Sequence, residues 1–500
     1  MTKEIVVIGA GIGGLTAGAL LACRGYDVTV YEQAYVPGGC ASTFKRRGFT
    51  FDVGATQVAG LEPGGIHQRI FAELGIDLPQ TTPCDPACAV FLPGETQPIN
   101  VWRDRQKWQA ERQRQFPNSE PFWQLMSKLF QASWKFQSRD PVLPPRNLWD
   151  IWQLATAIRL DTLLTVPFTL MTVGDALKLY GLYENKRLKT FLDLQLKLYS
   201  QVNADETALL YAATALGVSQ EPQGLYHLQE SMQVLSDRLV EGLEKQGGKI
   251  LVGHKVEKID NNTLTIRQQK TGKTFTQTAD HIIANVPVQN LVQMVDTSSS
   301  LWKLYQKRVD RLPEASGAFV IYLGVDRQVI PENCPPHLQF FYEYDGPIGE
   351  NNSLFVSVSK PGDGRAPDGK ATLIASSFTD PQIWWQASQE KYDQLKQQYT
   401  EEAIARLSNY FHLNADTILH QEAATPRTFA HFTARHRGIV GGIGQRVSTF
   451  GPFGIATRTP IKNIWLVGDS THPGEGTAGV SYSALTAVRQ IEQLFTTQEN

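Results

Sequence analysis

Residues 5–14 read Ile-Val-Val-Ile-Gly-Ala-Gly-Ile-Gly-Gly, an apolar run that passes directly into a glycine-rich turn. The run Glu4–Ile8 places β-branched residues on both faces of a strand, as a buried parallel strand requires. The spacing Gly9-x-Gly11-x-x-Gly14 predicts a tight turn that leads into a helix over 15–24. Alone, this motif is also compatible with a chance glycine turn, so its context decides what it means.

The residues after the predicted helix supply that context. A second strand, Asp27–Tyr31, ends at Glu32, so strand, turn, helix, strand and carboxylate follow one another as in a dinucleotide-binding unit. The glycines permit the turn, the close approach of a pyrophosphate and the packing of helix on sheet, in that order. The helix N-terminus presents free N–H groups to the phosphates, and Glu32 can accept hydrogen bonds from a ribose. The predicted dinucleotide-binding residues of this unit are Gly9, Gly11, Gly13, Gly14 and Glu32.

Two further glycine-bearing segments follow the ribose carboxylate. Residues 37–42 contain adjacent glycines, which allow backbone to run close along a bound dinucleotide, and Phe51–Thr56 is suited to lining a flavin ring. The alternative is that both segments are ordinary loops. From them we predict cofactor contacts by Gly38, Gly39, Ala41, Ser42, Gly54, Ala55 and Thr56.

The end of the chain carries a second strand-and-glycine pattern. Ile464–Val467 is the predicted strand, and Gly468 and Asp469 follow it, where the carboxylate can accept a hydrogen bond from a ribityl hydroxyl. A helix is predicted over 481–495, and Gly479 and Val480 precede it, where a helix N-terminus favours the negative charge of a reduced isoalloxazine. NAD dehydrogenases have no need of this second site. We therefore predict that the two ends of the chain fold into one sheet around FAD.

Bulk composition excludes several classes of protein. At 500 residues the chain is too long for one ordinary core, so two or more domains are expected. The formal net charge of -2 gives no reason to expect nucleic acid as a partner. The cysteine count of 5 is odd, which argues against a disulfide framework and for a reducing compartment. Cys84 and Cys88 form the only close pair, without flanking histidines, so no metal site is expected.

The uncharged stretch Ile5–Cys23 has two interpretations. It resembles a secretory segment, and Leu20–Cys23 resembles a lipoprotein cleavage box. However, cleavage at Cys23 would destroy the glycine turn, so the dinucleotide interpretation is preferred and no signal peptide is expected. The other apolar runs are shorter than the about 20 residues that a transmembrane helix needs.

The middle of the chain divides into two regions. Residues 76–214 are predicted to form a helical insertion, in which Ser119 caps a helix with one apolar face made of Phe122, Leu125, Met126, Leu129 and Phe130. Residues 291–449 contain alternating strands, between 318 and 377, that predict an antiparallel sheet below a substrate site. Residues 1–75, 215–290 and 450–500 are left as a discontinuous FAD-binding domain.

The helical insertion has two interpretations, one structural and one functional. It is either a second hydrophobic core or a lipid-facing, tunnel-lining lobe. The basic and aromatic stretch Trp102–Trp108 is either a solvated helix face or a surface that rests on anionic headgroups. Arg435, His436 and Arg437 are either entrance residues or solvated charges.

Taken together, these motifs resemble the flavin amine oxidase and phytoene desaturase superfamily, and within it the bacterial-type carotenoid desaturases and carotene isomerases. The residues that carry the resemblance are Gly9–Gly14, Glu32, Gly38-Gly39, Phe51–Ala55, Gly247-Gly248 with Val256, and Gly468-Asp469 with His472-Pro473-Gly474. The resemblance implies an α/β fold: a Rossmann-like FAD-binding domain of the GR2 type, a mixed α+β substrate domain and a helical, membrane-facing insertion. It also implies that Val256 contacts FAD.

The resemblance further implies the activity and the partners. The chain looks like a cyanobacterial carotenoid 3,4-desaturase, which removes hydrogens near one end of a long polyene. Peripheral attachment to the cytoplasmic face of a membrane is implied, with a quinone or oxygen as electron acceptor. The chain departs from the family pattern at Pro222–Leu225, which has a single glycine, and at Thr477-Ala478, where relatives often have a proline. These departures bear on the substrate more than on the cofactor.

Few residues are candidates for proton transfer. A polyene delocalises a developing carbocation, so flavin and tunnel do most of the work without a strong base. His472 and Glu475 follow the flavin strand and are the catalytic candidates, with a structural role in the loop as the alternative. Rival activities are carotene cis–trans isomerisation by reduced FAD, amine oxidation, which needs aromatic residues around the flavin, and non-enzymatic lipid escort.

Overall fold

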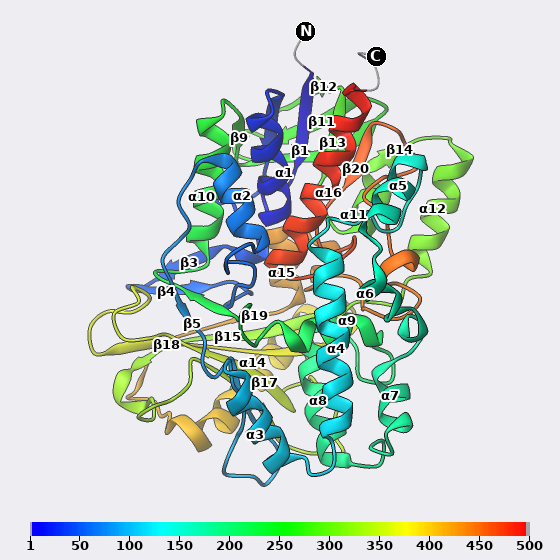
Figure 1. Cartoon of the computed structure of the whole chain (residues 1–500). Coiled ribbons are helices and arrows are strands. Elements are labelled where there is room, and N and C mark those ends of the chain that lie inside the picture. Colours follow the sequence, from blue (N-terminus) through cyan, green and yellow to red (C-terminus); the bar gives the residue numbers. More distant parts are fainter. Residues whose placement is uncertain (1–2, 497–500) are drawn as a thin grey trace.

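The computed structural model describes residues 3–496. The two ends of the chain meet in a five-stranded parallel sheet of order β20-β13-β1-β2-β9, in the upper half of Figure 1. Its strands are β1 (Glu4–Ile8), β2 (Asp27–Tyr31), β9 (Lys249–Leu251), β13 (His281–Ala284) and β20 (Ile464–Leu466). The prediction that both ends contribute strands to one sheet is confirmed, with β13 lying between β1 and β20.

Helices cover one face of this sheet and a small second sheet covers the other. Because side chains alternate along a strand, Ile5 and Val7 pack under the helices, whereas Val6 and Ile8 face the opposite side. The helices on the first face are α1 (Ile12–Cys23), α2 (Ile66–Leu74), α10 (Gln233–Lys245) and α16 (Thr477–Thr496). The second face meets β10 (His254–Asp260), β11 (Thr263–Gln268), β12 (Thr274–Thr278), β14 (Val295–Asp296), α11 (Val288–Met294) and α12 (Ser300–Asp310).

Two helices begin earlier than the sequence predicted. α1 starts at Ile12 rather than at residue 15, because Gly13 and Gly14 already belong to its first turn. α16 starts at Thr477 rather than at residue 481, so Gly479 and Val480 lie inside the helix. α1 carries no charge and is buried on nearly every side, between α10, α16 and the sheet.

A second sheet occupies the lower half of Figure 1, with strand order β19-β15-β18-β17-β16-β6-β7. Its strands are β6 (Cys88–Phe91), β7 (Ile99–Val101), β15 (Gly317–Asp326), β16 (His337–Phe341), β17 (Ser353–Val358), β18 (Lys370–Thr379) and β19 (Ile418–Ala424). The strands predicted between 318 and 377 pair antiparallel, as the sequence predicted. The sheet also includes β6 and β7, which come from the region predicted as helical, and β6 pairs with β16 in parallel. β6 is short and apolar, and it is buried between β16 and β7.

One face of the second sheet is covered and the other faces the interior of the molecule. α13 (Pro381–Trp385) and α14 (Gln389–Phe411) pack on the outer face, where Trp384 and Phe319 stack. On the inner face, Val320, Tyr322 and Ile374 contact the hairpin of β3 (Thr43–Arg46) and β4 (Phe49–Asp52). Short elements join these parts: β5 (Thr81–Pro83), β8 (Tyr226–Leu228), α15 (Pro426–Thr433), η1 (Gly39–Ala41), η3 (Arg327–Val329), η4 (His436–Gly438) and η5 (Gly451–Phe453).

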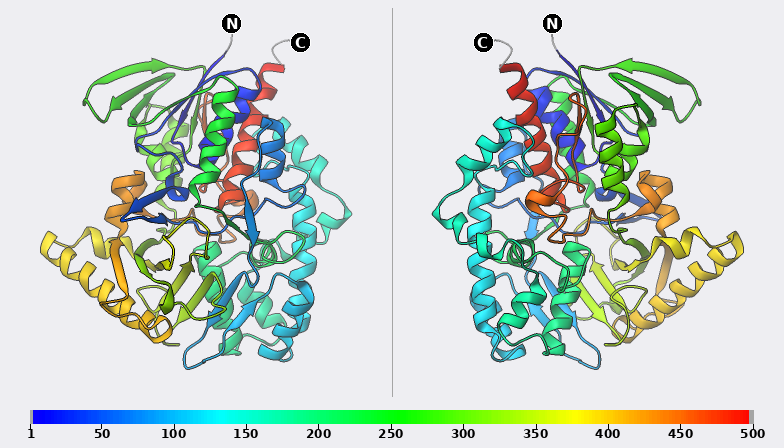
Figure 2. Two further views of the ribbon diagram at one scale, coloured as in Figure 1. Left: turned by 90° about the vertical axis from the view of Figure 1, so that its left-hand side faces the viewer. Right: turned by 90° about the vertical axis from the view of Figure 1, so that its right-hand side faces the viewer.

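The predicted insertion is mostly helical. It contains α3 (Arg105–Gln115), α4 (Glu120–Gln137), α5 (Leu148–Ala157), α6 (Leu160–Leu163), η2 (Val166–Phe168), α7 (Val173–Leu179), α8 (Lys186–Ser200) and α9 (Leu209–Gly217). Figure 2 shows α4, α5 and α6 on the opposite side of the molecule from α14. Within residues 3–496, no helix combines the length and apolar character needed to cross a bilayer.

One local prediction for the insertion is wrong. Ser119 occupies the N-cap of α4, but its hydroxyl donates to the Phe116 carbonyl instead of accepting from the helix. Of the two interpretations of Trp102–Trp108, contact with headgroups is disfavoured for Trp108, which is buried against Trp123 and Phe191. Most other side chains of α3 are polar.

Candidate active site

A large cavity of about 1360 Å³ lies between the two sheets. Its wall includes the glycine turn, residues 53–56, the inner face of β15 and β18, and parts of α4, α8 and α9. Every residue predicted from the sequence to contact cofactor or substrate lines this cavity except Gly14. The tertiary structure thus brings segments from 9 to 480 to one place.

The glycine turn has the close contacts that glycine alone permits. Gly9 has φ +91°, and the Gly38 N–H donates to the Ala10 carbonyl at 2.8 Å, so the two glycine segments lie against each other. A Cβ on Gly11 would lie 2.9 Å from Asn285 Nδ2, and one on Gly13 would lie 2.8 Å from Asn285 Oδ1. A Cβ on Gly14 would lie 2.0 Å from the Gly9 carbonyl, which gives this residue a packing role. The cradle is therefore backbone, open to a phosphate at the start of α1.

Glu32 lies at the carboxyl end of β2, where its buried carboxylate is already held by main chain. Oε2 accepts from Ala10 N at 2.7 Å and Oε1 from Ala34 N at 2.8 Å. Burial raises the pKa of Glu32, and these amides oppose the rise because they favour the charged form. Each oxygen keeps a second lone pair, so the carboxylate can still accept from ribose hydroxyls.

Asp469, after β20, is paired with Arg435. Arg435 Nη2 lies 2.7 Å from Asp469 Oδ2, and each side chain is 14% exposed. Of the two interpretations of the 435–437 stretch, solvated charges fail for Arg435, which lines the cavity. Arg437 is exposed and pairs with Glu314, as a solvated charge does.

His472 and Glu475 line the cavity, but three of their four polar side-chain atoms are enclosed by protein. Both ring nitrogens of His472 are enclosed without a partner, and burial lowers the pKa of His472 to about 4. Glu475 Oε2 accepts from Gln201 Nε2 at 2.9 Å and from Gly442 N at 3.3 Å, while Oε1 is enclosed without a partner. Burial, and then the nearby Asp469, raise the pKa of Glu475 to about 8. Both residues are therefore neutral at pH 7.

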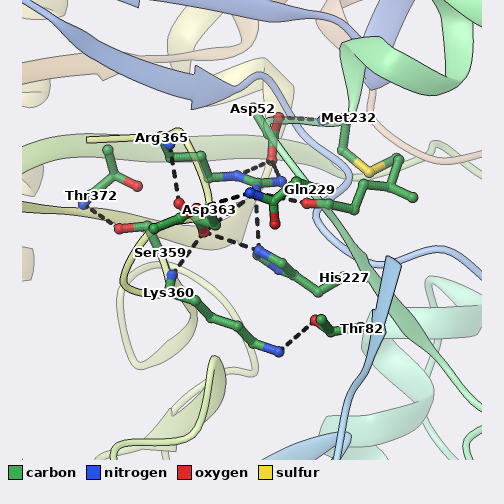
Figure 3. Close-up of polar contacts among 12 residues, drawn as sticks. Asp52, Thr82, His227, Gln229, Met232, Ser359, Lys360, Asp363, Arg365 and Thr372 are labelled. Atoms are coloured by element: carbon green, nitrogen blue, oxygen red, sulfur yellow. Dashed lines mark hydrogen bonds and ion pairs between the residues drawn. The ribbon is translucent and has the colours of Figure 1, made fainter. Parts of the chain in front are cut away.

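The segment 53–56 is anchored from behind by a buried polar network (Figure 3). Arg365 Nε and Nη2 donate to Asp52 Oδ2 at 3.3 and 3.1 Å. Asp52 Oδ1 accepts from Met232 N at 2.8 Å. Arg365 Nη1 donates to the Leu228 carbonyl, and Asp363 lies within hydrogen-bond distance of His227. The network joins β4, β8 and the connection between β17 and β18, so it positions one cavity wall against another.

Sequence reasoning missed the polar residue Asn285 of the cavity, and it named Arg435 only as an entrance residue or a solvated charge. Asn285 follows β13 and fills the space between the glycine turn and Gly468. Its position, at the carboxyl end of a parallel strand, was a usable signal because ligands bind at that edge. Arg435 had no such signal, since it follows a surface helix. Cys84 and Cys88 are buried free thiols, and residues 3–496 contain no group of three ligating side chains that could hold a metal ion.

The chain is similar to known proteins over almost its whole length. The family model described as flavin containing amine oxidoreductase matches residues 12–492. The chloroplastic prolycopene isomerase 2 of an Oncidium hybrid cultivar is 26% identical, covering 98% of this chain and 83% of that protein. The 4,4'-diapophytoene desaturase (4,4'-diapolycopene-forming) of Methylomonas sp is 23% identical, covering 98% and 96%. The solved cyclohexylamine oxidase of Brevibacterium oxydans IH-35A has a TM-score of 0.62 at 16% identity, covering 98% and 100%.

The solved neighbour shares the fold, and the family match extends over almost the whole chain. The predicted α/β fold with a dinucleotide-binding sheet is confirmed. The glycine cradle, the carboxylate at Glu32 and the second site after β20 fit FAD, as the sequence predicted, and FAD is the cofactor. The chain belongs to the family of flavin containing amine oxidoreductases, as an FAD-dependent oxidoreductase related to the carotenoid desaturases and isomerases.

Proposed function

We propose that the protein is a carotenoid desaturase, which removes two hydrogens from a long hydrophobic polyene. The observation that carries the proposal is the cavity, which continues from the dinucleotide cradle into an apolar space. Beyond the cradle its wall is largely apolar, with residues such as Leu194, Leu198, Leu210, Val320, Ile348 and Phe378. Relatives named as desaturases and isomerases of carotenes support the same substrate class.

FAD supplies the hydride acceptor, and the chain supplies binding and exclusion of water. The glycine turn, Glu32 and Asp469 would hold the cofactor, and the apolar wall would orient the polyene along it. Removal of a proton from the neighbouring carbon completes the double bond. Of the two candidates Glu475 is the stronger base, because its pKa is about 8 and that of His472 is about 4, but it accepts a proton only in its ionised form, which is the minor form at pH 7. For Glu475 to act directly, its enclosed Oε1 would have to rotate toward the cavity.

The substrate must come from a membrane, and one surface is suited to that. Along α5, α6 and η2 the apolar side chains face solvent: Leu148, Ile151, Trp152, Ile158, Leu160, Leu163, Leu164, Val166 and Leu170. Leu160 is 84% and Leu164 71% exposed, whereas the neighbouring Thr162 and Thr165 are buried. This inverted pattern is expected where the surrounding medium is apolar. Leu154, Ile158 and Val166 also line the cavity, so the patch lies at its mouth.

We therefore propose peripheral attachment through residues 148–170, on the cytoplasmic face of a membrane. The double variant Leu160→Asp and Leu164→Asp should lower partition into liposomes about 1000-fold, because two buried leucines contribute about 4 kcal/mol. The matched control is Gln394→Asp with Gln398→Asp, which adds the same charge to exposed positions of α14 on the opposite side. Equal sedimentation with liposomes for both variants would exclude the patch as the anchor.

The activity is tested by incubating FAD-loaded protein with lycopene, γ-carotene and poly-cis carotenes in liposomes, with a quinone or oxygen as acceptor. Desaturation lowers product mass by two hydrogens and shifts absorption to longer wavelength. A reaction near one end of the polyene is expected for a 3,4-desaturase. Unchanged substrates under both acceptors would overturn the proposal.

Carotene cis–trans isomerisation is the second candidate, because the 26% identical relative is named a prolycopene isomerase. It would change the spectrum of the poly-cis substrate at constant mass, under reduced FAD. Two other rivals are weaker. Tyr211 and Phe450 on the cavity wall meet at 75° rather than as parallel rings, unlike an aromatic cage for amines. A lipid escort without flavin has no use for the glycine turn, and a colourless purified protein would favour it.

A further inference from the structure

We propose that Arg435 is a cofactor-binding residue, whose free guanidinium nitrogen donates to the pyrophosphate of FAD while Asp469 holds the side chain in place. The inference rests on FAD as the cofactor and is independent of the polyene that is oxidised. No sequence motif pointed to a phosphate-binding role for Arg435, because it lies in the connection after α15, 34 residues before its partner.

The guanidinium of Arg435 is fixed at two of its three nitrogens. Nε donates to the Ile439 carbonyl at 2.8 Å. Nη2 donates to Asp469 Oδ2 at 2.7 Å and also to the Gly441 carbonyl. Nη1 has no partner among the described residues, and it is not enclosed by protein, since Arg435 is part of the cavity wall. The side chain therefore presents one preorganised donor to whatever occupies the cavity.

Only one of the two carboxylate oxygens of Asp469 is hydrogen-bonded among the described residues. Its Oδ2 holds Arg435, while Oδ1 accepts no hydrogen bond from the described residues and is not enclosed. The pair thus exposes a donor, Nη1, beside an acceptor, Oδ1. This arrangement suits a phosphate oxygen next to a ribityl hydroxyl, and it leaves the predicted role of Asp469 intact.

The cavity needs a cation at this place. Oxygens of a pyrophosphate carry full negative charge, and the glycine turn offers only N–H dipoles, so a buried phosphate calls for a compensating charge. Arg435 is close enough to the 38–42 segment to lower the pKa of the Cys40 thiol, although burial raises it by more. Burial alone would lower the pKa of Arg435, but Asp469 raises it, so the guanidinium stays charged.

Three lysine or arginine side chains besides Arg435 line the cavity. Lys197 donates to the Gln201 carbonyl and to Ser316 Oγ. Arg46 pairs with Glu422 at the surface. Lys255 has no side-chain partner among the described residues, so no contact fixes its ammonium, whereas Asp469 and two carbonyls hold the guanidinium of Arg435 in place.

The test measures binding to apoprotein rather than activity. FAD and ADP are titrated separately, FAD by quenching of its fluorescence and ADP by calorimetry. Arg435→Gln should weaken both ligands about 10- to 100-fold, because a hydrogen bond to a charged group contributes about 1.5–3 kcal/mol. Arg435→Lys keeps the positive charge and should lose less affinity for both ligands. This variant keeps the inference testable if the glutamine variant folds poorly. Arg437→Gln, two residues away and exposed, is the matched control and should bind as the parent does.

Two results would overturn the inference. Unchanged FAD affinity in both variants at Arg435 would remove the residue from cofactor binding. Weaker FAD with unchanged ADP would place the contact on the flavin half instead of the pyrophosphate. Because neither readout involves a carotenoid, failure of the proposed activity leaves this test untouched.

Discussion

Two arginine–aspartate pairs of the molecule, Arg365–Asp52 and Arg435–Asp469, differ in how many of their polar atoms are hydrogen-bonded. Arg365 uses all three guanidinium nitrogens in contacts with Asp52, the Leu228 carbonyl and the His227–Asp363 pair (Figure 3). The side chains of Arg365 and Asp52 are only 3% and 1% exposed. Arg435 and Asp469 are each 14% exposed and keep one nitrogen and one oxygen free.

The comparison shows that the residue types of an ion pair do not by themselves identify a binding site. A fully bonded buried pair organises the protein around it, and removing one partner leaves a charge that nothing compensates. A partly bonded pair on a cavity wall has capacity for a ligand. We therefore treat the Arg365 network as scaffold and the Arg435 pair as site, and the following predictions test that division.

The largest effect is expected from Arg365→Met. Asp52 and Asp363 would keep their charge in a buried place without a cation, so unfolding free energy should fall by about 3–5 kcal/mol. The measurement is the denaturant midpoint of the holoprotein. Arg406→Met is the matched control: Arg406 pairs with Glu402 and Glu343 at the surface, so its loss should cost less than about 1 kcal/mol. Similar midpoints for the two variants would mean that the buried network is not scaffold.

An intermediate effect is expected from Glu32→Ala. Glu32 resembles the Arg435–Asp469 pair, because its carboxylate lies in the cavity wall and each of its oxygens has a lone pair available for a ligand. Its loss should weaken FAD about 10- to 100-fold, through the lost ribose contact and the two amides left unbonded. Glu32→Gln keeps one oxygen acceptor and should lose less. FAD fluorescence titrations measure the affinity of the parent protein and of the two Glu32 variants. Equal FAD affinity for all three would show that Glu32 does not bind the cofactor.

The smallest effect is a dependence on pH, from Glu475. Its pKa of about 8 in the folded protein exceeds the ordinary value of 4.5, so between these pH values only the folded state holds the proton. Unfolding free energy should therefore fall as pH rises from about 4.5 to 8, by at most about 1.4 kcal/mol for each pH unit. Glu475→Gln, which cannot ionise, should flatten this slope in denaturant midpoints taken at several pH values. The exposed Glu390→Gln is the control, and parallel slopes for both variants would show that Glu475 is not buried neutral.

Much of the nucleotide-binding half could be predicted because its signals are local. β1 and β2 have the predicted bounds, since apolar β-branched runs ending in glycine or a carboxylate leave few alternatives. The strands β15, β17 and β18 lie within a few residues of the predicted range, 318 to 377, for the same reason. The cofactor followed from two such motifs at the two ends of the chain.

How segments that are distant in the sequence pack against one another could not be predicted from local patterns. Cys88–Phe91 joins the second sheet because an open edge lies beside it, which no local pattern records. The apolar residues of 158–170 were visible as a run, but only packing decides that Thr162 turns inward and Leu160 outward. The domain boundaries drawn from the sequence remain a prediction.

The sequence by itself determined that this protein holds a dinucleotide between its first and last strands, because glycine spacing and strand periodicity are properties of neighbouring residues. Only the tertiary structure decided which charges share the cavity with that dinucleotide. Arg435 and Asp469 are brought together by the packing of distant elements, and the burial that makes their free atoms significant exists only after the chain has folded.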